Sequence, residues 1–233
     1  MIFLHGANSG ASELQPFVEA MKPYAQVRTP DIAGHGGRPL LRHPTMRVLA
    51  DDLVAWMDRE GIARDLVGGY SFGGTLAFYL ARHHPGRVTG VVGLAAKHDF
   101  GEATLRHWRH LLTHERLERL QLPGRPRRIE ELARLHAPNT WQDVADMDTR
   151  LFETFAADPP LSHADLQAIR VPAMLVSSNV DPIVPWEETL ALGRALPDAH
   201  VAMFLGPAHP LGAIPLHPIA RNIHQWMAQR KLA

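Results

Sequence analysis

The segment Gly69–Gly73, with the sequence Gly-Tyr-Ser-Phe-Gly, constrains the fold of this chain more than any other stretch. A short apolar run precedes it, and an almost wholly apolar run, Leu76–Ala81, follows it before Pro85. An apolar run that ends in glycines and leads into a second apolar run is typical of a strand, a sharp turn and a buried helix. We therefore expect Ser71 to lie at the turn, with the helix starting beside it.

The pattern Gly-x-Ser-x-Gly is typical of a nucleophile elbow, in which a strained turn raises a serine hydroxyl above the sheet. Side chains at positions 69 and 73 would crowd the crossing of strand and helix, and glycine lacks the Cβ atom that causes the clash. Two other interpretations are a glycine-rich turn that contains a serine by chance and a phosphate-binding turn. A P-loop is excluded because no lysine follows the glycines.

The length and composition favour a single domain. With 233 residues, 45% of them hydrophobic and 21% charged, the chain is long enough to bury a large core. Lysine and arginine number 24, and so do aspartate and glutamate, so the charge balance predicts no binding to nucleic acid or to an anionic membrane surface. No apolar run approaches the length of a transmembrane helix.

The chain has no cysteine, which excludes a disulfide framework, a thiolate nucleophile and a cysteine-ligated zinc site. The segment Met1–Leu4 leads straight into a glycine-containing loop and resembles no signal peptide. We therefore expect a cytoplasmic protein.

Strands and helices alternate along the rest of the chain. Short apolar runs predict further strands at 1–4, 25–29, 88–95, 171–177 and 201–205. Helical spacing of apolar residues predicts helices among them, including 187–196 and 213–230. This alternation predicts an α/β fold with a parallel sheet that is covered by helices on both faces.

Motifs at the ends of the predicted strands resemble, in order, those of the α/β-hydrolase superfamily. Besides the elbow they are His5-Gly6, Asp31-x-x-Gly34-His35-Gly36, Asp181-Pro182-Ile183-Val184-Pro185 and Gly206-Pro207-Ala208-His209-Pro210. The resemblance covers nearly the whole chain outside residues 98–160. It implies the α/β-hydrolase fold and a catalytic triad in the chain order serine, acid, histidine. Residue by residue, the triad falls on Ser71, Asp181 and His209.

The chemistry of a triad requires these residue types. A serine hydroxyl is a weak nucleophile until a neutral imidazole accepts its proton, and a carboxylate must fix the tautomer of that imidazole. Two alternatives stay open. His217 is close enough to His209 in the sequence to be the base, and Asp99 is the rival acid because some relatives carry the acid after that earlier strand.

The resemblance also implies an oxyanion hole made by two backbone N–H groups. One belongs to Phe72, directly after the serine, and the other to Ala7, directly after His5-Gly6. The positive end of the helix that starts at the elbow would face the same oxyanion.

Neither a metal nor a cofactor is expected. His5, Asp31 and His35 resemble residues that brace loops in relatives through hydrogen bonds to the backbone, and no metal-ligand spacing links them. Three further histidines share a helix face without a carboxylate ligand pattern, and we expect them to be solvated: His107, His110 and His114.

The chain departs from the superfamily pattern in two ways. It opens at the strand before His5-Gly6, without the usual N-terminal hairpin, so we expect a sheet of about six strands with 26–29 at one edge. Residues 98–160 form an insert with helical patterns, which we expect to be a lid over a core made of 1–97 and 161–233. From 97 to 128 the insert is mostly basic and from 129 to 160 mostly acidic, so we expect its halves to pair rather than to bind an anion.

The lid carries apolar side chains that we expect to face the triad and bind substrate, namely Trp108, Leu111 and Leu112. In the competing interpretation an arginine holds a substrate carboxylate, the candidates being Arg106, Arg109 and Arg116. We prefer an apolar ceiling because Glu115 and Glu118 lie within a helical turn of those arginines, and we expect them to neutralise the arginine charges.

Together these features predict a carboxylesterase that cleaves small to medium esters through an acyl-enzyme, without a cofactor. A thioesterase, a C–C bond hydrolase or a lyase would use the same triad, and a receptor of this fold would bind its ligand with slow turnover. The expected partner is a small-molecule ester or acyl substrate, and the protein is expected to be a monomer or a homodimer.

Overall fold

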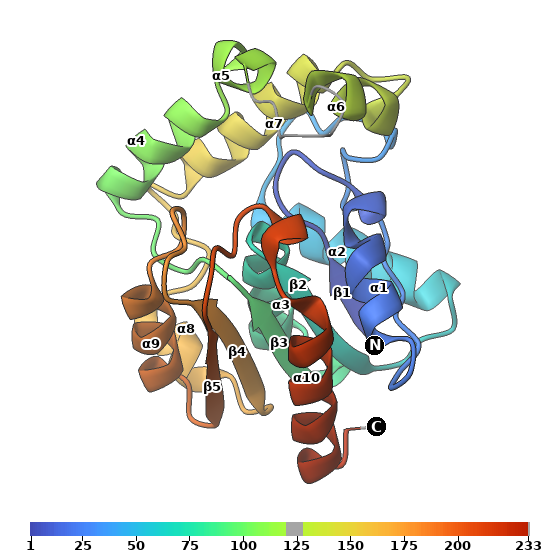
Figure 1. The fold of residues 1–233 in the computed structure, drawn as a ribbon. Helices are drawn as coiled ribbons and strands as arrows, with labels where there is room; N and C mark the ends of the chain where they lie inside the picture. Colours follow the sequence, from blue (N-terminus) through green and yellow to red (C-terminus); the bar gives the residue numbers. More distant parts are fainter. Residues whose placement is uncertain (120–127, 233) are drawn as a thin grey trace.

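The computed structural model describes residues 1–119 and 128–232, which form a parallel sheet flanked by helices, with a further group of helices at one end (Figure 1). In these ranges the sheet has five strands in the order β1-β2-β3-β4-β5, and every neighbouring pair is parallel. The strands are β1 (Ile2–Leu4), β2 (Asp65–Tyr70), β3 (Val88–Leu94), β4 (Ala173–Ser178) and β5 (Ala199–Phe204). Their carboxyl ends therefore lie along the same edge.

Helices cover both faces of the sheet, as the alternation of strands and helices predicted (Figure 1). One face carries α1 (Gln15–Met21) and α10 (Leu216–Arg230), and the other carries α2 (Met46–Arg59), α3 (Phe72–His83), α8 (His163–Ala168) and α9 (Trp186–Ala195). Alternate strand residues enter the two cores, because successive side chains of a strand point to opposite faces. In β1, Ile2 and Leu4 pack on the α2 and α3 side, whereas Phe3 stacks on Phe17 of α1.

Residues 25–29 do not form a strand, so the prediction of about six strands was wrong. Their pairing with β1 is a single bridge, in which Phe3 N–H donates to the Arg28 carbonyl and Arg28 N–H donates to the Met1 carbonyl, both at 2.9 Å. The next bond of a parallel ladder would come from the N–H of residue 30, and Pro30 has none. The bridge therefore stops after one residue.

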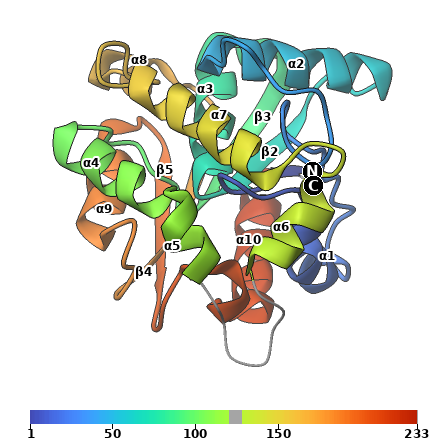
Figure 2. The ribbon, with the colours of Figure 1, turned by 90° about the horizontal axis from the view of Figure 1, so that it is seen from above.

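Five of the described helices lie between β3 and β4 in the chain, and all of them except α8 lie over the carboxyl edge of the sheet (Figure 2). Those over the edge are α4 (Glu102–Leu111), α5 (His114–Arg119), α6 (Arg128–His136) and α7 (Trp141–Thr154). They fall within residues 98–160, which we retain as the proposed lid. Short 3₁₀ turns elsewhere in the chain are η1 (Ala11–Leu14), η2 (Pro85–Arg87) and η3 (Leu211–Ala213).

The apolar face of the proposed lid is continuous with the main core. Phe152 of α7 packs edge-on against Phe72 of α3, with ring centroids 5.3 Å apart, and Trp108 of α4 lies 4.7 Å from Phe152. The halves of the insert are joined by an ion pair between Arg109 and Glu153 at 3.4 Å, and His114 Nε2 lies 2.9 Å from Asp146 Oδ1. The predicted pairing of the basic and acidic halves is thus confirmed for these residues.

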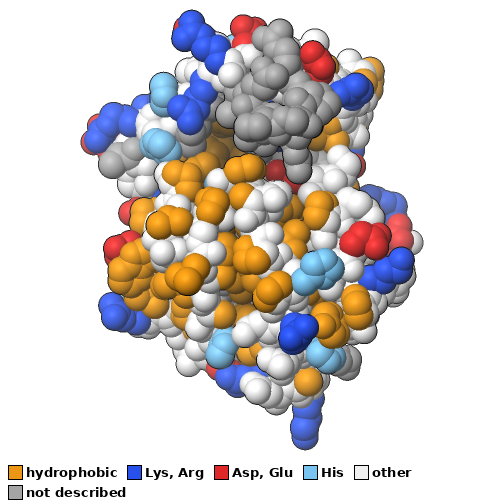
Figure 3. All heavy atoms as spheres, viewed as in Figure 1, with side chains coloured by type: hydrophobic (Ala, Val, Ile, Leu, Met, Phe, Trp, Pro, Cys, Tyr) orange, Lys and Arg blue, Asp and Glu red, His pale blue; other side chains and the backbone are white. Residues whose placement is uncertain are grey.

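Apolar side chains gather on the face that carries β5 and α10 (Figure 3). The exposed large ones at the β5 edge and its neighbouring loops are Val180, Met203 and Leu205. Within the two described ranges, no helix has the length and apolar character needed to cross a bilayer.

Candidate active site

Ser71 lies on a sharp turn between β2 and α3, as the Gly-x-Ser-x-Gly pattern predicted. Its backbone has φ 53° and ψ −120°, a conformation that a non-glycine residue rarely adopts and that surrounding contacts must hold. A Cβ atom at Gly69 would lie 2.2 Å from the carbonyl carbon of Gly73, and one at Gly73 would lie 2.4 Å from the Leu4 carbonyl oxygen. Both positions therefore require glycine for the close crossing of strand and helix.

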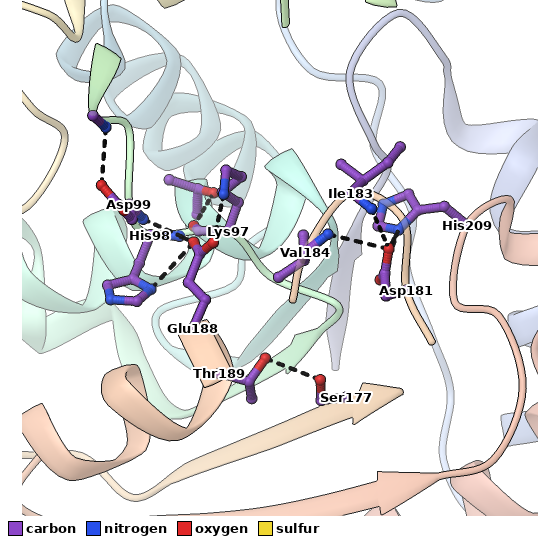
Figure 4. Close-up of polar contacts among 12 residues, drawn as sticks. Lys97, His98, Asp99, Ser177, Asp181, Ile183, Val184, Glu188, Thr189 and His209 are labelled. Carbon is purple, nitrogen blue, oxygen red and sulfur yellow. Dashed lines mark hydrogen bonds and ion pairs between the residues drawn. The ribbon is translucent and has the colours of Figure 1, made fainter. Parts of the chain in front are cut away.

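Asp181 and His209 come together from the loops that follow β4 and β5 (Figure 4). His209 Nδ1 lies 2.8 Å from both carboxylate oxygens of Asp181, whose side chain is buried. Asp181 also accepts hydrogen bonds from the backbone N–H groups of Ile183 at 2.8 Å and Val184 at 3.1 Å. Because Nδ1 carries the hydrogen toward Asp181, Nε2 of the neutral ring is left as a proton acceptor.

Ser71 and His209 line the same cavity, which has a volume of about 790 Å³. Nε2 of His209 is buried and has no hydrogen-bond partner among the described residues. This nitrogen, which a serine hydrolase would use as its base, is therefore not bonded to any other described residue and can accept a proton. Hydrogen bonds of catalytic groups are often long in ligand-free proteins and tighten when substrate binds.

Of the two predicted oxyanion donors, Ala7 lines this cavity and Phe72 directly follows Ser71, which lines it. Phe72 is the first residue of α3, so its N–H has no carbonyl partner one turn earlier in the helix. Ala7 lines the cavity in the loop after β1. The preceding peptide is held by Nδ1 of His5, which lies 2.8 Å from the Gly6 carbonyl oxygen.

The rival triad residues lie elsewhere. Asp99 is exposed, and its carboxylate accepts a hydrogen bond from Gly101 N–H at 2.9 Å. It lines a groove with His98 and His163 rather than the cavity of Ser71. His217 is exposed in the first turn of α10.

A buried ion pair holds the first residues of the insert against α9 (Figure 4). Glu188 accepts hydrogen bonds from the ammonium group of Lys97 and from the backbone N–H groups of His98 and Asp99. Burial alone would raise the pKa of Glu188, but the hydrogen bonds from His98 and the charge of Lys97 lower it to about 2. This cluster anchors the start of the insert and has no contact with the cavity of Ser71.

Loop-bracing by His5, Asp31 and His35 is confirmed. His5 Nε2 accepts a hydrogen bond from Ile32 N–H at 3.0 Å, and Asp31 accepts one from Ala11 N–H at 2.7 Å. His35 Nδ1 lies 3.3 Å from the Ala33 carbonyl oxygen. Burial, followed by the nearby charge of His35, lowers the pKa of His5 well below its usual value.

Asp148 of α7 is a fully buried carboxylate beside His35. The two groups lie 3.2 Å apart, and Asp148 also accepts a hydrogen bond from Asn8 N–H at 2.6 Å. Burial alone would lower the pKa of His35, but the charge of Asp148 and the hydrogen bond to it raise that pKa. His136, which accepts from Gly36 N–H, has its pKa lowered to about 4 by burial and by the charge of His35.

The insert supplies one wall of the cavity. Trp108 and Leu112 line it, as do apolar and charged residues of the following helices: Leu117, Leu135, Arg116, Arg128, Glu131 and Arg134. The side chain of Leu111 lies outside the described residues, so its predicted place in the site is not described. Among the residues described, no group of three or more histidine, aspartate or glutamate side chains is arranged to hold a metal ion.

Two residues that contact the site were missed from the sequence. The Tyr70 ring lies tilted against His209, with ring centroids 4.9 Å apart, but its position before the serine gives no distinctive signal. Asp148 did leave a signal, because it falls at helical spacing among the buried residues of α7, which include Val144 and Leu151. A charged residue on an apolar helix face indicates a buried partner.

The family assignment follows from comparison with known proteins. A sequence model described as the alpha/beta hydrolase family matches residues 1–221. The chain belongs to this family.

Curated relatives of this α/β hydrolase include named esterases. A pimeloyl-[acyl-carrier protein] methyl ester esterase of Aromatoleum aromaticum is 29% identical over 242 residues, which cover 88% of this chain and 88% of the relative. One of Vibrio atlanticus is 25% identical over 229 residues, covering 90% of this chain and 86% of the relative.

Solved structures share the fold of this α/β hydrolase. A thermophilic esterase from Thermogutta terrifontis aligns with a TM-score of 0.74 and 21% identity, over 98% of this chain and 89% of that one. The enol-lactonase from Burkholderia xenovorans LB400 aligns with a TM-score of 0.72 and 19% identity, over 100% of this chain and 91% of that one. At these identities the likeness establishes the fold alone.

Proposed function

We propose that this α/β hydrolase is a carboxylesterase that cleaves small to medium esters through an acyl-enzyme on Ser71. The observation that carries the proposal is the Asp181–His209 pair beside the elbow serine. His209 lines the same cavity as Ser71, and its Nε2 has no hydrogen-bond partner among the described residues. A serine on an elbow, a neutral imidazole and a buried carboxylate are the groups that acyl transfer requires.

In the acylation step, Ser71 Oγ attacks the ester carbonyl carbon while His209 Nε2 takes the hydroxyl proton. Asp181 holds the ring and stabilises the imidazolium that forms, because it accepts the Nδ1 hydrogen at 2.8 Å. The N–H groups of Phe72 and Ala7 bind the oxyanion. The imidazolium then gives its proton to the departing alcohol, and the acyl group stays on Ser71.

In the deacylation step, water replaces the alcohol. His209 takes a proton from the water as it attacks the acyl carbonyl, and the same N–H groups bind the second oxyanion. When this intermediate collapses, the proton returns to Ser71 Oγ and the carboxylic acid leaves. Every step uses groups of this chain and water.

The cavity supports a substrate with an apolar acyl part. Its volume of about 790 Å³ lies within the range of sites for small organic ligands, and Trp108 and Leu112 supply apolar surface. The names of the curated relatives make a pimeloyl-[acyl-carrier protein] methyl ester the first natural substrate to test.

A substrate panel tests the proposal. Purified protein is assayed with p-nitrophenyl esters, carboxylic methyl esters, acyl-thioesters and dicarbonyl compounds of the kind that C–C bond hydrolases cleave. Each assay is run with the wild type and with Ser71→Ala. We expect the highest kcat/KM on oxygen esters and its loss in the variant. Preference for thioesters or dicarbonyls would change the reaction class, and binding without turnover would favour a receptor.

A further inference from the structure

The buried carboxylate of Asp148 reaches from the insert to the oxyanion loop. Asp148 lies on α7 and has no exposed surface. Its Oδ2 accepts a hydrogen bond from the backbone N–H of Asn8 at 2.6 Å. Asn8 directly follows Ala7, whose N–H is the second donor of the proposed oxyanion hole.

We propose that Asp148 is a positioning residue for hydrolysis, which aims the Ala7 N–H at the oxyanion by holding the peptide between Ala7 and Asn8. The inference rests on the proposed function, because it assigns a role to a residue that acts through an oxyanion donor.

The hydrogen bonds around Ala7 hold the peptides on both of its sides. The Gly6 carbonyl and the Ala7 N–H belong to one peptide unit, and His5 Nδ1 holds that unit through the carbonyl at 2.8 Å. Asp148 holds the following unit through the Asn8 N–H. With both peptide planes held, the dihedral angles of Ala7 are fixed, and so is the direction of its N–H.

The insert also reaches the other backbone group of Asn8. Asn8 has φ 47°, in the left-handed region that asparagine tolerates better than most residues with a side chain. Its carbonyl accepts a hydrogen bond from Arg128 of α6 at 3.4 Å. The insert thus contacts both polar backbone groups of Asn8, and the contact to the N–H is charge-assisted.

His35 balances the buried charge of Asp148. Nε2 of His35 lies 3.2 Å from the carboxylate oxygens, and Nδ1 lies 3.3 Å from the Ala33 carbonyl oxygen. Both ring nitrogens face acceptors, an arrangement that favours the imidazolium form. Asp148 therefore has two partners in the core, the Asn8 N–H at 2.6 Å and His35 Nε2 at 3.2 Å.

Asp148 therefore connects α7, which contributes no residue to the lining of the cavity, to the oxyanion loop. The carboxylate is fixed to the core through His35, and Met147 beside it accepts a hydrogen bond from Leu41 N–H at 3.5 Å. A change at Asp148 should alter the stabilisation of the oxyanion without altering how the ester docks in its ground state.

The test compares Asp148→Ala and Asp148→Asn with Glu188→Gln. Glu188 is the matched control, since it is another buried carboxylate that accepts backbone N–H groups of the insert but lies away from the oxyanion loop. Three quantities are measured on each folded variant: kcat per active site titrated with a fluorophosphonate, KM for a p-nitrophenyl ester, and the inhibition constant of a trifluoromethyl ketone. The ketone forms an oxyanion when serine adds to it.

We expect Asp148→Ala to lower kcat and the affinity for the ketone together, each by about 10- to 100-fold, with KM changed by less than about twofold. Asp148→Asn should show a smaller loss of the same kind, because its amide oxygen still accepts from Asn8 N–H. Glu188→Gln should keep kcat per titrated site and the ketone affinity.

Wild-type kcat and ketone affinity in folded Asp148→Ala would overturn the inference, as would equal losses in Glu188→Gln. If Asp148→Ala does not fold, the same readouts on Asp148→Asn decide. A failure of the proposed function looks different, because then Ser71→Ala would keep ester turnover and the fluorophosphonate would not titrate the protein.

Discussion

The hydroxyl of Tyr70 donates a hydrogen bond to the backbone carbonyl of Ala208 at 3.0 Å. Tyr70, which precedes the proposed nucleophile Ser71, thus holds Ala208, which precedes the proposed base His209. The Tyr70 ring also lies against His209, with centroids 4.9 Å apart. One side chain therefore ties the elbow to the histidine loop, and burial raises its pKa, which keeps the hydroxyl a donor.

Tyr70→Phe should keep the ring contact and lose the hydrogen bond. We expect the free energy of unfolding to fall by about 1 kcal/mol, since a buried carbonyl loses its donor, and kcat to fall by a few-fold. Urea unfolding and ester kinetics measure the two effects. Tyr79→Phe is the control, because Tyr79 lies on α3 beside His83, away from the cavity. Equal effects in both variants would contradict the role of Tyr70.

Asp181→Asn should keep the fold and lower kcat by roughly 10³- to 10⁴-fold, because the amide favours the wrong tautomer of His209. Asp99→Asn is the matched control. It should keep most activity, since the Asp99 carboxylate accepts a hydrogen bond from Gly101 N–H and not from His209. Circular dichroism checks the fold and steady-state kinetics checks the activity. If Asp99→Asn lost activity and Asp181→Asn kept it, the acid of the triad would have to be reassigned to Asp99.

The Glu188 cluster predicts a pH-dependent stability. The pKa of Glu188 is about 2 in the folded protein and about 4.3 in an unfolded chain. A depressed carboxyl pKa stabilises the fold above the unfolded value, and this contribution is lost as the pH falls from about 4.3 towards 2. At pH 7 this stabilisation amounts to about 3 kcal/mol, because the two pKa values differ by about 2.3 units and each unit corresponds to about 1.4 kcal/mol.

Glu188→Gln should therefore be less stable than wild type at pH 7 by about that amount, and the difference should shrink at pH 3. Urea unfolding at both pH values measures it. The exposed neighbour Glu187 provides the control variant Glu187→Gln, for which we expect little change at either pH. A stability difference that stays the same at pH 7 and pH 3 would be inconsistent with the ion pair as its source.

The apolar surface of Trp108 in the cavity predicts that kcat/KM depends on acyl length. Each methylene that enters an apolar cavity adds about 0.8 kcal/mol, or about fourfold in kcat/KM, until the cavity is full. We expect this rise along a series of neutral p-nitrophenyl esters from C2 to C12, and a smaller rise in Trp108→Ala. Trp186→Ala is the control, because Trp186 lies on α9 and does not line the cavity.

Esters with a terminal carboxylate test the competing interpretation. Arg106 pairs with Glu102 at 2.9 Å and Arg109 with Glu153 at 3.4 Å, whereas Arg116 lines the cavity. A strong preference for the carboxylate series that is lost in Arg116→Ala would replace the apolar ceiling by an anion-binding site.

The candidate site could be proposed from the sequence because its residues follow apolar runs that predict strands. Ser71, Asp181 and His209 each follow an apolar run, and parallel strands bring such positions to one edge. Glycines 69 and 73 fixed the turn itself, since a side chain at either position would collide with backbone.

Features set by distant contacts were not predictable in the same way. The run 25–29 has strand-like composition, yet pairing depends on the missing N–H of Pro30 and leaves a single bridge. The contact between Asp148 and Asn8 joins positions 140 residues apart, and helical spacing shows only that the carboxylate is buried. Its partners depend on how the insert packs on the core.

The most direct test of the central claim is mass spectrometry after treatment with a fluorophosphonate, which traps activated serines. We predict a single added mass that maps to the peptide containing Ser71, no addition in Ser71→Ala, and loss of ester turnover in step with labelling. Labelling of another serine, or full ester turnover in Ser71→Ala, would contradict the assignment of Ser71 as the nucleophile.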